Sequence, residues 1–145
     1  MRQTGFRIAV LAATLAVLAI SASADDLVAL KPTAAPVLTT SQTIIGQPIA
    51  YPSGTATVAS SVITIPPDGE TGWHLHAVPL FGYILAGELT VDYGDKGTHI
   101  YKTGDGLMEA INWPHNGMNM GTVPVRILAV YMGAEGIPNA TVVSH

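Results

Sequence analysis

The sequence contains no cysteine and little charge. With no Cys among its 145 residues, a disulfide framework, a thiolate nucleophile and a Cys-ligated metal site are all excluded. Charged residues make up 11% of the chain, and 6 Lys and Arg against 10 Asp and Glu give a net charge of −4. No nucleic-acid partner is expected, because such a partner requires a basic surface. Apolar residues, at 48%, exclude disorder as the dominant state.

Residues 1–24 have the features of a secretory signal peptide. Arg2 and Arg7 flank the start, a short apolar run extends from Ile8 to Ile20, and Ala22-Ser23-Ala24 offers small residues for cleavage. A membrane span needs about 18 or more apolar residues, which is more than this run provides. We therefore expect a periplasmic or secreted protein that is cleaved after residue 24 and has no membrane association afterwards.

The rest of the chain is predicted to be all-β. Residues 25–42 contain prolines and no periodicity, so they are expected to form an extended N-terminal arm, with a single domain over 43–145. That domain has short segments rich in β-branched residues between Gly- and Pro-containing turns, a pattern typical of sandwiches and barrels. No window longer than about ten residues shows a capped helical period. The expected strands are 55–65, 81–86, 89–93, 98–102, 107–111 and 125–132.

Three of the five histidines are candidate metal ligands. His74 and His76 are two residues apart, a spacing that places both imidazoles on one face of a strand. His115 lies in a turn that leads into a further strand, and it is the candidate third ligand. His99, next to an exposed hairpin turn, and His145, the final residue, are expected to be solvated and outside the site.

The surroundings of these histidines resemble the two motifs of the cupin superfamily. Gly69 to Leu89, which contains His-Leu-His, is similar to the first motif. Gly104 to Asn119, which contains Pro-His and ends in Asn, is similar to the second. The resemblance covers residues 63–132 and implies a single-domain cupin β-barrel, which is a double-stranded β-helix or jelly roll.

The resemblance also implies the site. It assigns His74, His76 and His115 as ligands of one divalent transition metal, for which Fe, Mn, Ni, Cu and Zn are all candidates. It gives Asn119 a structural role in holding the backbone near the site. By analogy with other small cupins, the chain is expected to form a homodimer through sheet edges or arms.

One position departs from the family pattern. The first cupin motif usually has a glutamate four or five residues after its second histidine, where this chain has Leu80 and Phe81. Glu109 is the predicted replacement, either as a metal ligand or as a catalytic acid or base, because a carboxylate in an apolar strand is costly to bury without a cation. The alternative is a solvent-facing Glu109, and its neighbours Met108 and Ala110 do not decide between the two.

The resemblance implies several functions. A three-His or three-His-plus-Glu metal centre is typical of dioxygenase-, decarboxylase- or isomerase-like cupin enzymes that act on a small organic molecule. The first alternative is a periplasmic cupin that binds a small ligand without catalysis, in a barrel mouth rimmed by Val78, Leu80, Phe81 and Met108. The second alternative is copper handling, since Met118 and Met120 follow His115 and thioethers favour Cu(I).

Overall fold

The computed structural model describes residues 31–144. The predicted signal peptide and His145 lie outside the described residues. The chain divides into two compact units, Met1–Ala34 and Ala35–His145, and every strand of the described residues belongs to the second unit. Residues 35–41 of the expected arm are exposed and have no regular secondary structure. Across residues 31–144, no helix has the length and apolar character needed to cross a membrane.

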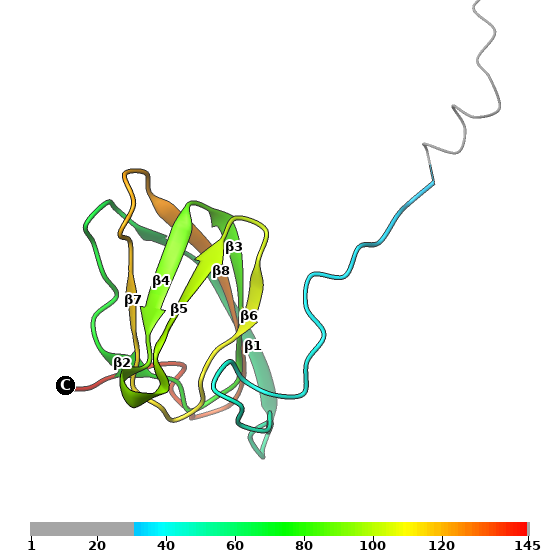
Figure 1. Ribbon diagram of the computed structural model, residues 1–145. Helices are drawn as coiled ribbons and strands as arrows, with labels where there is room; N and C mark the ends of the chain where they lie inside the picture. The colour runs from blue at the N-terminus through cyan, green and yellow to red at the C-terminus, as the bar shows by residue number, and fades with distance from the viewer. Residues whose placement is uncertain (1–30, 145) are drawn as a thin grey trace, which may run out of the picture. The chain divides into compact units, whose positions relative to one another are not determined.

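Two antiparallel sheets and one short ladder make up the domain (Figure 1). The larger sheet has the order β1-β8-β3-β6, with bounds Ala56–Ile65, Val125–Ala134, Leu80–Ala86 and Gly106–Met108. The smaller sheet has the order β5-β4-β7, with bounds Thr98–Lys102, Glu88–Asp92 and Asn116–Met118. The ladder joins β2 (His74–Leu75) to β9 (Thr141–Val142). The predicted all-β barrel is confirmed.

The core lies between the two sheets and follows the two-residue period of the strands. Leu89 and Val91 of β4 face inward from the smaller sheet, while Ile84 of β3 and Ile127 of β8 face inward from the larger one. Beyond the end of β4, Tyr93 is fully buried in the same cluster. The same alternation also turns other side chains of these strands toward the interior of the barrel.

Several strands differ from their predicted bounds. The strand expected over 107–111 ends at Met108, because the backbone N–H of Ile111 donates to the side-chain oxygen of Gln47 instead of to a neighbouring strand. The hairpin turn is a 3-10 helix, Gly94–Lys96. Strand β9 was not expected, and the strands expected at His74 and after His115, which are β2 and β7, were given no bounds, since segments of two or three residues are too short to show a period.

A segment ahead of β1 covers the outer edge of β6. The backbone N–H of Ile44 donates to the carbonyl of Met108 at 2.9 Å, and Gln42 bridges to Pro48 across the segment's own turn. As a result Met108 is buried on the outer face of β6. The opposite edge of the sheet is β1, whose residues are mostly exposed.

The turn from β3 to β4 depends on Gly87. Its φ is +80°, and a Cβ there would lie 2.9 Å from the carbonyl oxygen of Pro124 and 3.0 Å from the Cα of Val125. Gly97 has a similar φ of +89°, but a Cβ there would have no atom within 4 Å. Both glycines therefore have a positive φ that other residues rarely adopt, but only at Gly87 would a side chain clash with neighbouring backbone atoms.

We expect Gly87→Ala to destabilise the fold by about 2–4 kcal/mol, because a backbone cost adds to a clash with backbone atoms that cannot move aside. Gly97→Ala should carry only the backbone cost, about 1–3 kcal/mol, of a positive φ with a ψ of −172°. Chemical denaturation of the two variants measures the difference. Equal losses at both positions would show that the close approach of Gly87 to residues 124–125 has no energetic effect.

Candidate metal centre

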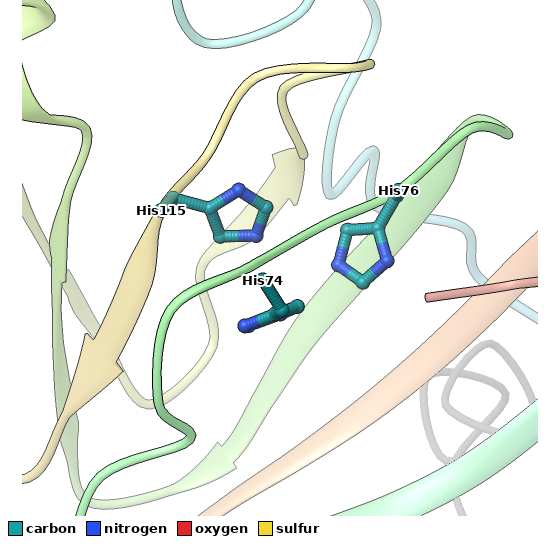
Figure 2. Close-up of side chains that lie close together, drawn as sticks. All are labelled: His74, His76 and His115. Carbon is teal, nitrogen blue, oxygen red and sulfur yellow. The ribbon is translucent and has the colours of Figure 1, made fainter. Parts of the chain in front are cut away.

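Three histidines converge inside the barrel. His74 begins β2, His76 lies just beyond β2, and His115 precedes β7. His74 and His115 are held opposite each other by two backbone hydrogen bonds of 3.0 and 2.9 Å. Figure 2 shows the rings of His74 and His76 reaching from one segment and the ring of His115 from another toward the same space. One nitrogen from each ring lies within 4.8 Å of the other two.

Backbone carbonyls hold all three rings through Nδ1. A carbonyl oxygen only accepts hydrogen bonds, so each Nδ1 carries the proton and donates it, and each Nε2 keeps its lone pair. This arrangement is common for metal-binding histidines, because the outer hydrogen bond fixes both the tautomer and the ring orientation. The pairs are His74 with Gly72 at 2.7 Å, His76 with Asn139 at 2.8 Å and His115 with Trp113 at 2.9 Å.

Burial keeps the imidazoles neutral. Desolvation lowers the pKa of His74 and His115, and it lowers the pKa of His76 to about 4. Neutral imidazoles are the form that binds a metal. The Nε2 of His115 is also buried and has no hydrogen-bond partner. Because a buried polar atom is costly without a partner, these three residues fit a metal ion.

Glu109 points into the same space. It is 6% exposed, and its Oε2 lies 3.8 Å from the Nε2 of His115. Its other oxygen accepts the backbone N–H of Ala110 at 2.8 Å. Burial raises the pKa of Glu109, and hydrogen bonds from Ala110 and from the Tyr93 hydroxyl act in the opposite direction. The solvent-facing alternative for Glu109 is therefore wrong, while its role as a ligand stays a prediction.

The inward direction of Glu109 has a simple cause. Leu107 lines the interior cavity, and the residue two positions further along an extended chain takes the same side. Glu109 continues that extended path, since its backbone N–H donates to the carbonyl of Leu80 at 2.9 Å. Its neighbour Met108 takes the opposite face of β6 and is also buried, while Ala110 is buried in the core cluster.

The interior cavity has a volume of about 60 Å³ and is lined by the three histidines and Glu109. Its apolar wall comes from both sheets and includes Leu80, Leu89, Val91, Leu107 and Ile127.

The set of rim residues expected from the sequence is mostly wrong. Leu80 lines the cavity, but Val78, Phe81 and Met108 do not. Phe81 and Met108 alternate with the lining residues Leu80 and Leu107, so they occupy the opposite faces of their strands.

Other candidate residues lie outside this centre. Asn119 has the expected structural role, since its side chain donates to the carbonyls of Ile65 and Val123 at 3.0 and 2.9 Å. His99 was expected to be solvated, and this is wrong. It is half-buried, with its ring centroid 5.7 Å from that of Tyr93, because alternation on β5 turns it toward the core.

Neither methionine of the copper hypothesis lines the cavity. Met120 is 73% exposed. Met118 alternates with Gly117, which does line the cavity, so Met118 takes the opposite face of β7.

Sequence reasoning missed two contributors to the site. Tyr131 lines the cavity, with its ring centroid 5.6 Å from that of His76. The alternation Ile127, Ala129, Tyr131 along β8 is a signal that could have found it. The second is the carbonyl of Asn139, which belongs to the C-terminal segment 137–144 that pairs with β2. A backbone carbonyl has no sequence signal.

About half of the chain matches a cupin family. Residues 61–131 match the model of the cupin domain family described as "Cupin domain". The fold is that of the cupins, as the sequence motifs predicted. No curated protein sequence matches the chain.

Solved structures share this fold. Lactobacillus farciminis oxalate decarboxylase in a formate complex is similar with a TM-score of 0.53 and 22% identity, over 60% of this chain and 27% of that one. The polyketide cyclase RemF from Streptomyces resistomycificus has a TM-score of 0.52 and 21% identity, over 61% of each chain. Bacillus subtilis oxalate decarboxylase, described with Mn(II) centres, has a TM-score of 0.50 and 22% identity, over 60% of this chain and 24% of that one. This chain covers less than two thirds of the length of each.

We expect the protein to bind about one divalent transition metal per chain. Changing His74, His76 or His115 to Ala should weaken binding by 10- to 100-fold or more, because each removes one of three nitrogen donors. The control is His99→Ala, which alters a half-buried imidazole outside the centre. Elemental analysis and metal titration of each variant measure the effect. Full occupancy in the double variant His74→Ala/His76→Ala would contradict this assignment.

The C-terminal segment should contribute to metal affinity through one carbonyl. A chain that ends at Gly136 lacks the Asn139 acceptor for His76, so its metal affinity should fall by about 10- to 100-fold. A chain that ends at Ala140 keeps that carbonyl and loses the β9 pairing and the hydrogen bond from the Val143 backbone N–H to the Trp73 carbonyl. It should retain most of the affinity in the same titration. Equal weakening in the two truncations would assign the effect to β9 instead.

Proposed function

We propose that this protein is an exported, metal-dependent cupin enzyme that acts on a small organic molecule by dioxygenase-, decarboxylase- or isomerase-like chemistry. The observation that carries the proposal is the convergence of three neutral Nε2 atoms and one carboxylate in an apolar cavity. Imidazole and carboxylate donors suit Fe, Mn, Ni, Cu or Zn. The Mn(II) centres described for B. subtilis oxalate decarboxylase, which shares the fold, support this range.

The three histidines and Glu109 would have different roles. His74, His76 and His115 would hold the metal, and when bound it would act as a Lewis acid that polarises substrate oxygen. Glu109 has two roles open to it, as a fourth ligand or as the base that takes a proton from a substrate hydroxyl or acidic C–H group. Its 3.8 Å separation from the Nε2 of His115 supports both, because a bound substrate would lie within reach.

A carboxylate buried beside three neutral rings also argues for a cation. Burial alone favours the protonated form of Glu109, and it favours the neutral form of each imidazole. A divalent ion at the Nε2 atoms would stabilise the ionised carboxylate and bind the unprotonated rings. The ionised form of Glu109 and the neutral forms of the three imidazoles are therefore most stable together when a metal is bound.

Two other expectations stay open to experiment. A protein that binds a ligand without catalysis would use the same cavity, and a measurement of turnover distinguishes it from an enzyme.

Pairing with a second copy of the chain stays a prediction. The exposed edge strand β1 supports it, since its ten residues from Ala56 to Ile65 include no charged side chain. The copper-handling alternative has no support from the positions of Met118 and Met120 described above.

The proposed function is tested by Glu109→Gln, which keeps the shape and removes the charge. We expect the fold to survive, with metal affinity lowered about 10-fold or more, or with activity lost in a substrate screen that monitors oxygen. The control Glu88→Gln changes an exposed carboxylate and should match the wild type. Unchanged metal binding together with unchanged turnover would remove Glu109 from the site.

Export is tested on the protein made with its full sequence. We expect the soluble periplasmic or secreted form to begin at Asp25, because the residues up to Ala24 have the small-residue pattern of a cleavage site. N-terminal sequencing or intact mass measures this. Recovery of the soluble exported protein with Met1 in place would refute it.

A further inference from the structure

The interior cavity is open to solvent on one side. Among the described residues that line it, Thr71 is exposed and Ile63, His74 and Tyr131 are half-buried, while all the others are buried. Thr71 and His74 belong to the segment around β2, and Ile63 and Tyr131 belong to the adjacent strands β1 and β8. Solvent therefore reaches the histidines between these two borders.

Strand β1 borders this opening with small side chains. Ser61 pairs with Ala129 and Ala59 pairs with Tyr131, and both partners line the cavity. Because paired residues of neighbouring strands share a face, Ser61 and Ala59 are turned to the cavity side of the sheet. Both are nevertheless exposed, whereas Ile63 on the same face is half-buried. The interior of the barrel thus opens along β1 from Ile63 toward Ala59.

Hydrogen bonds fix the borders of the opening. The side chain of Asn119, just beyond β7, donates to the carbonyl of Ile65 at 3.0 Å and joins the two sheets at that end of β1. On the opposite border the Thr71 hydroxyl accepts the backbone N–H of Gly117 at 2.9 Å. The free width of the opening therefore depends on the size of the side chains along β1.

We propose that the cavity-side face of β1 at Ala59 and Ser61 is the entrance through which a metal ion and a small ligand reach the three histidines, and that the small size of these two side chains keeps it passable. The inference rests on the proposed function, but it assigns a route and no chemical step. The hydroxyls of Ser61 and Thr71 on the two borders can hydrogen-bond to the water carried by a hydrated ion.

An entrance residue has a kinetic signature. Because it does not touch the bound metal, a larger group there raises the barrier for entry and exit by the same amount. Loading and release should then slow equally, and the Kd should not change. A residue that supports the structure of the site would change the Kd instead.

The lack of cysteine in the chain allows a reversible test. In a Ser61→Cys variant the new thiol is unique and close to serine in size. Benzyl methanethiosulfonate attaches a benzylthio group to it through a disulfide, and a reducing agent, removed before measurement, takes the group off again. The matched control is Ser60→Cys, which is adjacent and also exposed but lies on the opposite face of β1.

We expect the benzylthio group at position 61 to slow Co(II) loading of the metal-free protein by about 10-fold or more, as followed by visible absorption. Release of Co(II) to excess chelator should slow by the same factor, and reduction should restore both rates. The group at position 60 should change neither rate. Equal rates in the two modified variants, or a loss of affinity that accounts for the slower loading at position 61, would overturn the inference.

A second readout needs no metal. Diethyl pyrocarbonate modifies imidazole nitrogens, and peptide mass spectrometry gives its rate at His74 relative to His99, which does not line the cavity. The benzylthio group at position 61 should lower this ratio by a similar factor, and the group at position 60 should not. An unchanged ratio would reject the entrance. If the wild-type protein binds no Co(II), the proposed metal site fails, while the His74 ratio still decides whether this face of β1 is the entrance.

Discussion

The site depends on three hydrogen bonds that lie outside it. Each donates from the Nδ1 of a histidine to a backbone carbonyl, so each Nε2 faces the interior as a neutral acceptor. Two of the carbonyls, of Gly72 and Trp113, precede their histidines by two residues and are set by local turns. The third, of Asn139, comes from the far end of the chain. The cluster is therefore complete only when the carbonyl of Asn139 lies against the ring of His76.

Strand alternation connects the fold to the chemistry. The same two-residue period that fills the core with Leu89, Val91 and Ile127 places Glu109 two positions beyond Leu107, inside the cavity. An apolar interior gives the imidazoles their lowered pKa values and raises the pKa of Glu109. The barrel thus creates the electrostatic conflict that a divalent cation would resolve, and among residues 31–144 no Lys or Arg side chain lines the cavity.

Much of this was predictable from the sequence, and the exceptions have physical causes. The spacing of His74 and His76 predicted that their rings share a face, and the resemblance of the motif around His115 predicted the third member of the cluster. The direction of Glu109 was left open because its neighbours Met108 and Ala110 are also buried. Residues 42–48 cover that outer face of β6, a tertiary contact that no local pattern reveals. The carbonyl of Asn139 was not predictable, since every residue has one.

X-ray absorption spectroscopy of the metal-loaded protein tests the central claim most directly. The account predicts scattering from three imidazoles, each bound through Nε2 at about 2.0–2.2 Å. It also predicts that the His74→Ala variant, loaded at a higher metal concentration, loses one of them. A metal environment with oxygen donors and no imidazole scattering would contradict the account, because the metal would then be bound away from the three histidines.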